Sequence, residues 1–181
     1  GSPIELDGVV ESIGAIEVAA QWTAERQAAW QRLDELLDRL REHGTRIAFW
    51  WRDDDAVAAT PALERLLALR ASVGVPLSLA VVPAHADETL AQRLAREPEI
   101  GVLQHGFAHA NQAPPGAKKV ELGHCPLPLV LGEIELGAQR LSRLFGRRFR
   151  PVMVPPWNRI DPALPKQLPD LGLRGLSTFK D

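Results

Sequence analysis

The sequence predicts an α/β domain in which parallel strands alternate with helices, on the basis of three observations. Short apolar runs recur along the chain, and amphipathic stretches with helix start and stop signals separate them. Strands that alternate with helices are joined by right-handed crossovers, which makes the strands parallel. Unusual polar residues follow several of the apolar runs, at the strand ends where open α/β sheets and barrels place their sites.

Capping residues and prolines set the expected boundaries of the elements. Thr23 is a candidate N-cap, and Gly44 would stop the helix that it begins. Thr60 precedes Pro61, a pair typical of a helix start. The predicted helices cover residues 23–44, 60–74, 87–96 and 129–145, with an irregular one from 161. The predicted strands cover residues 46–51, 76–82, 100–103, 151–154 and 173–177, and a long loop covers 106–128.

Length and composition limit the possible class of protein. We expect an N-terminal arm over residues 1–22 and one domain over residues 23–181. The net charge of -2 argues against a nucleic-acid partner, and the single cysteine excludes an internal disulfide. No apolar stretch approaches the ~20 residues of a membrane span, and no signal peptide is visible, so we expect a cytoplasmic protein. Gly1-Ser2 resembles a cloning remnant, so a native leader could precede it, and the sequence does not fix the oligomeric state.

Acidic residues and histidines follow two of the predicted strands. Asp53, Asp54 and Asp55 come after the first strand, and His105 and His109 come after the third. Two histidines four residues apart and one carboxylate can hold a divalent metal and leave a position open for water. A second carboxylate could act as the general base on that water. The pattern predicts one divalent metal ion, for which zinc fits best, although other first-row ions also suit these ligands.

Each of these motifs alone has a simpler interpretation. A histidine pair four residues apart is more often found at a surface or a helix cap, and a run of aspartates is usually a solvated turn. In an unrelated α/β protein the acids and histidines would never meet. Their shared place at the carboxyl ends of strands favours a metal site over these alternatives.

Three strings resemble the motifs of the polysaccharide deacetylase family, the NodB-like members of carbohydrate esterase family 4. They are WRDDDA, HGFAH and, more loosely, VPPWNR. The chain looks most similar to a divergent bacterial branch with RDDD, QHG-x-x-HAN and PPWNRI-type strings, over residues 46–177. The resemblance implies a distorted (β/α) barrel, usually of seven strands. It also implies metal-dependent removal of an acetyl group from an N-acetylated sugar or polysaccharide.

The resemblance also implies roles for the acids and histidines. Asp54 would be the general base that acts on a metal-activated water, and Asp55 would bind the metal, although the pair Asp53 and Asp54 is the other possible register. His105 and His109 match the two histidine ligands of the family.

The third string and the long loop over residues 106–128 supply the remaining candidates. The backbone N–H of Trp157 matches the oxyanion donor of the family, and Arg159 could orient the base because Val154 stands where the family has an arginine. Asn111, Pro156 and Trp157 are the expected substrate contacts.

The sequence departs from the family pattern towards its end. Only five strands are visible, and the later motifs, including the histidine that protonates the leaving amine, have no match. We therefore expect a barrel that is incomplete at the C-terminus. A non-catalytic glycan-binding or scaffold domain on the same fold is the alternative function.

Overall fold

The structure, a computed structural model, describes residues 7–46, 48 and 50–179. The chain divides into two compact units, residues 1–49 and residues 50–181. The first unit contains α1 (Asp7–Glu42), which is followed by Gly44 in the left-handed conformation, as predicted. The predicted start at Thr23 is wrong, because α1 continues through it. The domain boundary after residue 22 stays a prediction.

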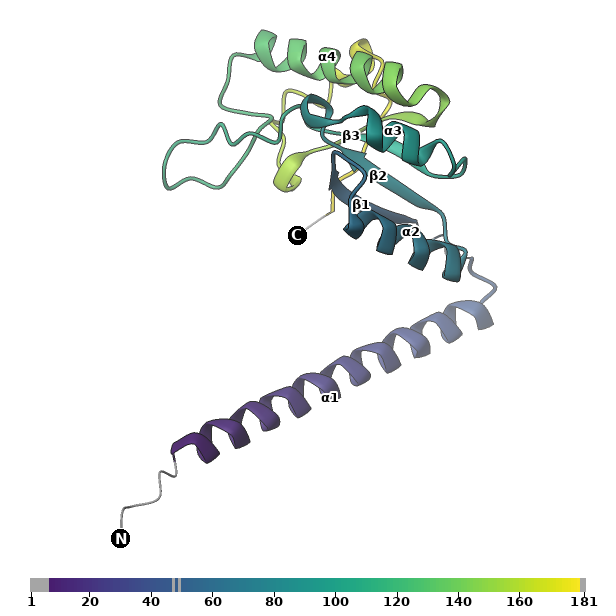
Figure 1. Ribbon diagram of the computed structural model, residues 1–181, viewed down its shortest axis with the longest axis vertical. Coiled ribbons are helices and arrows are strands. Elements are labelled where there is room, and N and C mark those ends of the chain that lie inside the picture. The colour runs from purple at the N-terminus through teal and green to yellow at the C-terminus, as the bar shows by residue number, and fades with distance from the viewer. Residues whose placement is uncertain (1–6, 47, 49, 180–181) are drawn as a thin grey trace. The chain divides into compact units, whose positions relative to one another are not determined.

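The second unit is built on a five-stranded parallel sheet with its strands in chain order (Figure 1). The strands are β1 (Trp51–Ala56), β2 (Leu77–Val81), β3 (Gly101–His105), β4 (Phe149–Val154) and β5 (Gly175–Leu176). The helices between them are α2 (Pro61–Val73), α3 (Glu88–Leu94) and α4 (Leu127–Phe145). This arrangement confirms the predicted parallel α/β fold. In the described part of the chain, no helix combines the length and the apolar character that a membrane crossing requires.

Two further predicted elements, the first strand and the helix from residue 161, differ in the structure. The first strand begins at Trp51, not at residue 46, and it contains the three aspartates rather than ending before them. Asp53 and Asp55 are exposed and Asp54 is partly exposed, so the acids of β1 remain within reach of water. Ile47 and Phe49 of the predicted strand lie outside the described residues. The helix expected from residue 161 is replaced by a short 3₁₀ turn, η4 (Leu168–Leu171), because three prolines remove backbone donors from this segment.

The two faces of the sheet bury different clusters of side chains. On the outer face, Leu79 and Val102 pack in the cluster that includes residues of α2, α3 and α4. On the inner face, Ala80, Leu103 and Val154 form a separate small cluster. Because successive side chains of a strand point to opposite faces, one sheet serves both clusters. This division is typical of a (β/α) barrel.

The sheet is strongly curved. Arg52 of β1 donates a hydrogen bond from NH1 to Ser177 Oγ at 2.6 Å, just beyond β5. In a flat sheet four strand spacings would separate β1 from β5 by about 19 Å, which is beyond the reach of one arginine side chain. The sheet therefore curls so that its two edge strands approach at their carboxyl ends.

Close packing between α4 and the sheet gives a first testable prediction. An added Cβ at Gly137 would lie 2.5 Å from Gln104 Nε2 and 3.1 Å from Pro83 Cγ, whereas an added Cβ at Gly132 meets nothing within 4 Å. We expect Gly137→Ala to lower the free energy of unfolding by about 1–3 kcal/mol through overpacking. Gly132→Ala in the same helix should instead raise it by up to about 1 kcal/mol through helix propensity. Urea unfolding measures both values, and equal stabilisation by the two changes would contradict this account.

Candidate metal centre

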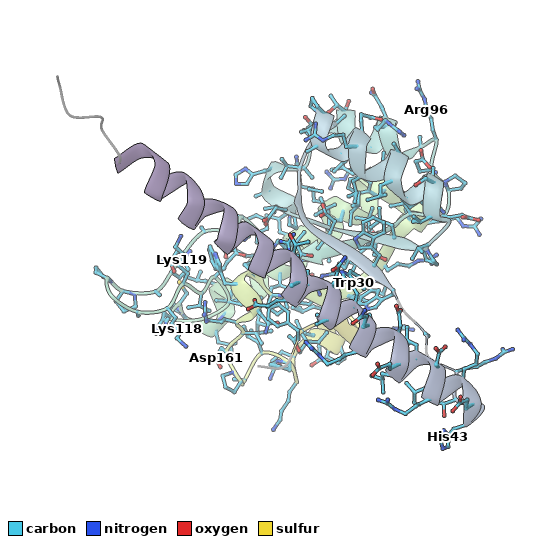
Figure 2. All side chains as sticks on the ribbon, turned by 90° about the horizontal axis from the view of Figure 1, so that it is seen from below. Trp30, His43, Arg96, Lys118, Lys119 and Asp161 are labelled. Carbon is cyan, nitrogen blue, oxygen red and sulfur yellow. The ribbon has the colours of Figure 1, made fainter. Side chains whose placement is uncertain are left out.

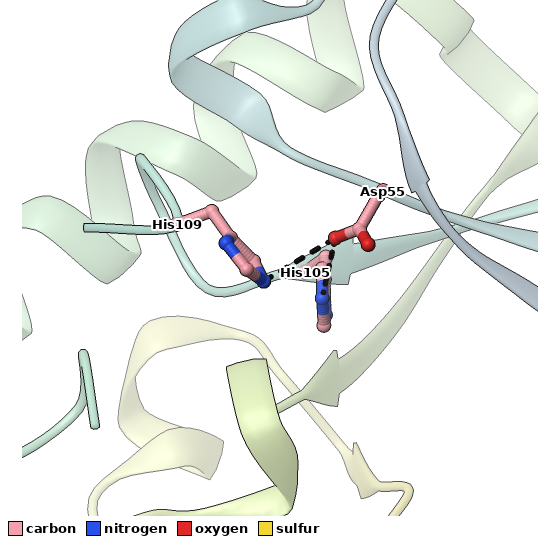
Figure 3. Close-up of side chains that lie close together, drawn as sticks. All are labelled: Asp55, His105 and His109. Carbon is pink, nitrogen blue, oxygen red and sulfur yellow. Dashed lines mark ion pairs between the residues drawn. The ribbon is translucent and has the colours of Figure 1, made fainter. Parts of the chain in front are cut away.

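Asp55, His105 and His109 converge at the carboxyl end of the sheet (Figure 3). Asp55 Oδ1 lies 3.2 Å from His105 Nε2 and 3.3 Å from His109 Nε2. One ligand atom from each residue lies within 4.8 Å of the other two. The acids and histidines that the sequence placed after separate strands therefore meet, which excludes the alternative in which they never do.

A register shift in β1 brings two aspartates to this place. The pairing of β1 with β2 shifts between Asp53 and Ala56, and Asp55 has a φ of 67°. In a regular strand Asp54 and Asp55 would point to opposite faces, but here both line one cavity of about 380 Å³ with the two histidines. Asp53 lies outside this cavity and lines another one beside α2. Partial burial raises the pKa of Asp53, and the carboxylates of Asp54 and Asp55 raise it further.

Hydrogen bonding orients His105 for binding through one nitrogen. His105 is the last residue of β3 and is buried, and its Nδ1 lies 2.9 Å from the carbonyl oxygen of Val154. A carbonyl accepts only, so the proton sits on Nδ1 and the lone pair of Nε2 faces Asp55. Burial lowers the pKa of His105, against the opposing effects of the Val154 carbonyl and the nearby carboxylates. The ring is thus suited to bind a cation as a neutral imidazole.

The three donors fit a divalent first-row metal. Zinc bonds to carboxylate oxygen and imidazole nitrogen are about 2.0–2.1 Å long, which at a tetrahedral angle places two ligand atoms about 3.3 Å apart. The distances from Asp55 Oδ1 to the two Nε2 atoms match this value. One carboxylate and two imidazoles would leave a fourth position for water on such an ion, and all three side chains line one cavity.

Arg52 holds Asp54 in place. Arg52 Nε donates to Asp54 Oδ1 at 2.7 Å, and Arg52 Nη2 donates to Asp54 Oδ2 at 3.1 Å, which makes a two-point ion pair. Arg159, which was expected to orient the base, instead donates from NH1 to the carbonyl oxygen of Lys119 at 3.0 Å. Arg52 was missed, although its place two residues before Asp54 puts both on one face of a strand.

The loop after β4 forms one wall of the cavity. Trp157 and Asn158 have φ values of 53° and 57°, and both line the cavity together with Arg159. The Trp157 ring lies 4.3 Å from the His109 ring between centroids. Lys119, on the long loop that also carries Lys118 (Figure 2), places its ammonium 5.8 Å from the centre of the Trp157 ring. Trp157, an expected substrate contact, therefore lines the cavity that Asp55, His105 and His109 also line.

Two predicted substrate contacts lie elsewhere. Asn111 Oδ1 accepts hydrogen bonds from the N–H groups of Ala113 and Val120, so this side chain shapes the long loop. Pro156 is buried and packs beside Gly106. Neither residue lines the cavity that Asp55, His105 and His109 share.

Glu121 is a further residue of this region that the sequence did not indicate. Its carboxylate is buried, with the residue only 3% exposed, and it accepts hydrogen bonds from backbone N–H groups on both sides of His109. An isolated glutamate in a polar loop carries no periodic or spacing signal, so sequence reasoning had no means to single it out.

Comparison with known proteins supports the fold. No family model matches the chain, and no curated protein matches it. A presumed polysaccharide deacetylase from Mycobacterium smegmatis has a similar crystal structure, with a TM-score of 0.52 and 20% identity over 65% of this chain and 37% of that one. A deacetylase solved with substrate has a TM-score of 0.46 and 15% identity over 66% of this chain and 53% of that one. This chain therefore spans well under two thirds of either structure, and the first of them shows that it has a polysaccharide deacetylase-like fold.

Proposed function

We propose that this domain is a metal-dependent hydrolase that removes an acetyl group from an N-acetylated sugar or polysaccharide. The observation that carries the proposal is the meeting of Asp55, His105 and His109 beside a second carboxylate, Asp54, in one open cavity. Three ligands with a separate base are the requirements of metal-assisted hydrolysis. The likeness to a deacetylase fold agrees with this chemistry.

The proposed ligands are Asp55 Oδ1, His105 Nε2 and His109 Nε2, and zinc is the proposed ion. When bound, such an ion polarises the acyl carbonyl and lowers the pKa of a water molecule beside it. The carbonyl of Val154 keeps the His105 ring in the orientation that presents Nε2. The exposed carboxylate of Asp55 faces the cavity through which a substrate would arrive.

Asp54 is the proposed general base, which accepts a proton from the attacking water at its carboxylate. Its two hydrogen bonds with Arg52 fix the carboxylate plane, and Arg52 is itself held by Ser177. The register shift supports Asp54 and Asp55 as the base and ligand pair over Asp53 and Asp54, because Asp53 lies outside the cavity.

Trp157 and Arg159 are the proposed wall against which the sugar binds. Both line the cavity, and the indole of Trp157 packs against the ring of His109. We assign the backbone N–H of Trp157 as the donor that stabilises negative charge on the acyl oxygen, since donors aimed at such an oxygen favour the transition state. Arg159, whose guanidinium donates to the Lys119 carbonyl, lines the same cavity and is proposed to contact the substrate.

Metal analysis and an acetate assay test this proposal together. We expect about one zinc per chain by elemental analysis, and release of acetate from a panel of N-acetylated oligosaccharides. A chelator should abolish the acetate release, and added zinc should restore it. Bound metal without acetate release would favour the glycan-binding or scaffold alternative, and no metal after dialysis against zinc would contradict the proposal.

A further inference from the structure

The loop that carries His109 is held through its backbone by the carboxylate of Glu121. Glu121 Oε2 accepts a hydrogen bond from the Phe107 N–H at 3.1 Å. Glu121 Oε1 accepts from the Ala108 N–H at 2.7 Å and from the Ala110 N–H at 3.3 Å. One buried side chain thus binds three of the four backbone donors between residues 107 and 110.

The carbonyl groups of the same loop are held from the opposite side. The Ala84 N–H donates to the Phe107 carbonyl at 2.8 Å, and His85 Nε2 lies 3.2 Å from the Ala108 carbonyl. Both donors belong to η1 (Pro83–His85), a 3₁₀ turn after β2. Glu121 therefore binds the backbone N–H groups of the loop, and η1 binds two of its backbone carbonyls.

His109 requires such support because its backbone is in an unfavourable region. Its φ is 55°, a left-handed value that costs an ordinary residue about 1–2 kcal/mol. This conformation aims the ring back towards Asp55, with Nε2 at 3.3 Å from Asp55 Oδ1. A residue held in this region keeps its conformation only where its surroundings fix it.

Gly106 provides the room for the Glu121 carboxylate. Gly106 has a φ of 55°, and a Cβ at this position would overlap Glu121 Oε2 and would lie 2.6 Å from Pro156 Cγ. Any larger residue would displace the carboxylate from the loop donors. The glycine between the β3 histidine and this loop is therefore part of the same arrangement.

We propose that Glu121 is a positioning residue for the metal centre, which acts through the backbone of residues 107–110 to hold His109 in its ligating orientation. This inference rests on the proposed metal site. The hydrogen bonds of Glu121 go to the segment that carries His109, the third proposed ligand. Glu121 should therefore affect metal affinity directly, and not only the stability of the fold. Glu121 needs no contact with the ion itself.

The test is a double-mutant cycle on metal affinity, with Glu121→Gln and His109→Ala. Glutamine keeps the shape of the side chain but replaces one acceptor oxygen with an NH₂ donor, so at least one loop N–H loses its partner. Zinc affinity, measured by competition with a chromophoric chelator, should fall about 10- to 100-fold in Glu121→Gln, as for other groups that orient metal ligands. In the His109→Ala background, Glu121→Gln should cause no further loss. The visible spectrum of bound Co²⁺ should also change in Glu121→Gln, because the ligand geometry changes.

Controls separate this role from a purely structural one. Glu135→Gln makes the same chemical change at an exposed position of α4 and should leave zinc affinity unchanged.

Unchanged affinity and Co²⁺ spectrum in Glu121→Gln, or an equal loss with and without His109, would overturn the proposal. If Glu121→Gln does not fold, the exposed His85→Ala removes the bond to the Ala108 carbonyl instead, and it must weaken zinc binding for the proposal to stand. Absence of metal from the unsubstituted protein would count against the proposed function. If the unsubstituted protein binds zinc and Glu121→Gln binds it with equal affinity, the result would count only against this inference.

Discussion

Replacing Asp54 with asparagine should stop turnover while the metal stays bound. The carboxamide has nearly the same shape as the carboxylate, but it cannot accept a proton from the attacking water. Loss of a general base typically lowers the rate about 100- to 10,000-fold. The carboxylate of Asp54 pairs with Arg52 and does not belong to the group of Asp55, His105 and His109, so these three proposed ligands should remain in place. The measurement is kcat for acetate release together with the zinc content of the same sample.

The neighbouring residue supplies the matched control. Asp53→Asn changes the same chemical group one position earlier, at a side chain that lies outside the cavity of the histidines. We expect turnover within a few-fold of the unsubstituted protein. If Asp53→Asn instead stops turnover and Asp54→Asn removes the metal, Asp53 and Asp54 are the base and ligand pair.

The double variant His105→Ala/His109→Ala should lose the metal altogether. Of the three donors only Asp55 would remain, and a single exposed carboxylate does not hold zinc against dialysis. Zinc per chain should fall from about one to nearly none by elemental analysis. Circular dichroism should show a folded protein, because His109 is partly exposed and His105 contributes one side-chain hydrogen bond to β4.

A histidine outside the site serves as the control for this loss. His43 lies at the end of α1, where its Nδ1 is 2.6 Å from the Arg39 carbonyl. His43→Ala should leave the zinc content unchanged. Zinc retained in the double variant would mean that the metal binds somewhere other than the proposed centre.

The sequence predicts the order of the elements well because their boundaries depend on local chemistry. Gly44 and Gly74 end helices in the left-handed conformation, and Thr60 and Asp87 accept hydrogen bonds from backbone N–H groups at helix starts. These are contacts within a few residues along the chain. The convergence of Asp55, His105 and His109 was also predictable, since parallel strands bring their carboxyl ends to one edge of a sheet.

Features that depend on distant contacts could not be predicted. The start of β1 is set by pairing with β2, where Trp51 lies opposite Leu77, and an apolar run before it gave a false boundary. Arg52 reaches Ser177 only because the sheet curls, a property of the assembled strands. Glu121 finds its partners in a loop more than ten residues earlier, and Asn111 Oδ1 accepts hydrogen bonds from loop N–H groups that no spacing rule identifies.

The hydrogen bond from Arg52 to Ser177 connects the curvature of the sheet to Asp54, the proposed base. One guanidinium connects the first strand, the carboxylate of Asp54 and the segment beyond the last strand. Any movement of β5 away from β1 would displace the Arg52 guanidinium, which fixes the Asp54 carboxylate. A ligand or chain segment that presses β1 and β5 together would restrict the motion of the Asp54 carboxylate. The distance between these two strands and the orientation of this carboxylate therefore depend on the same arginine side chain.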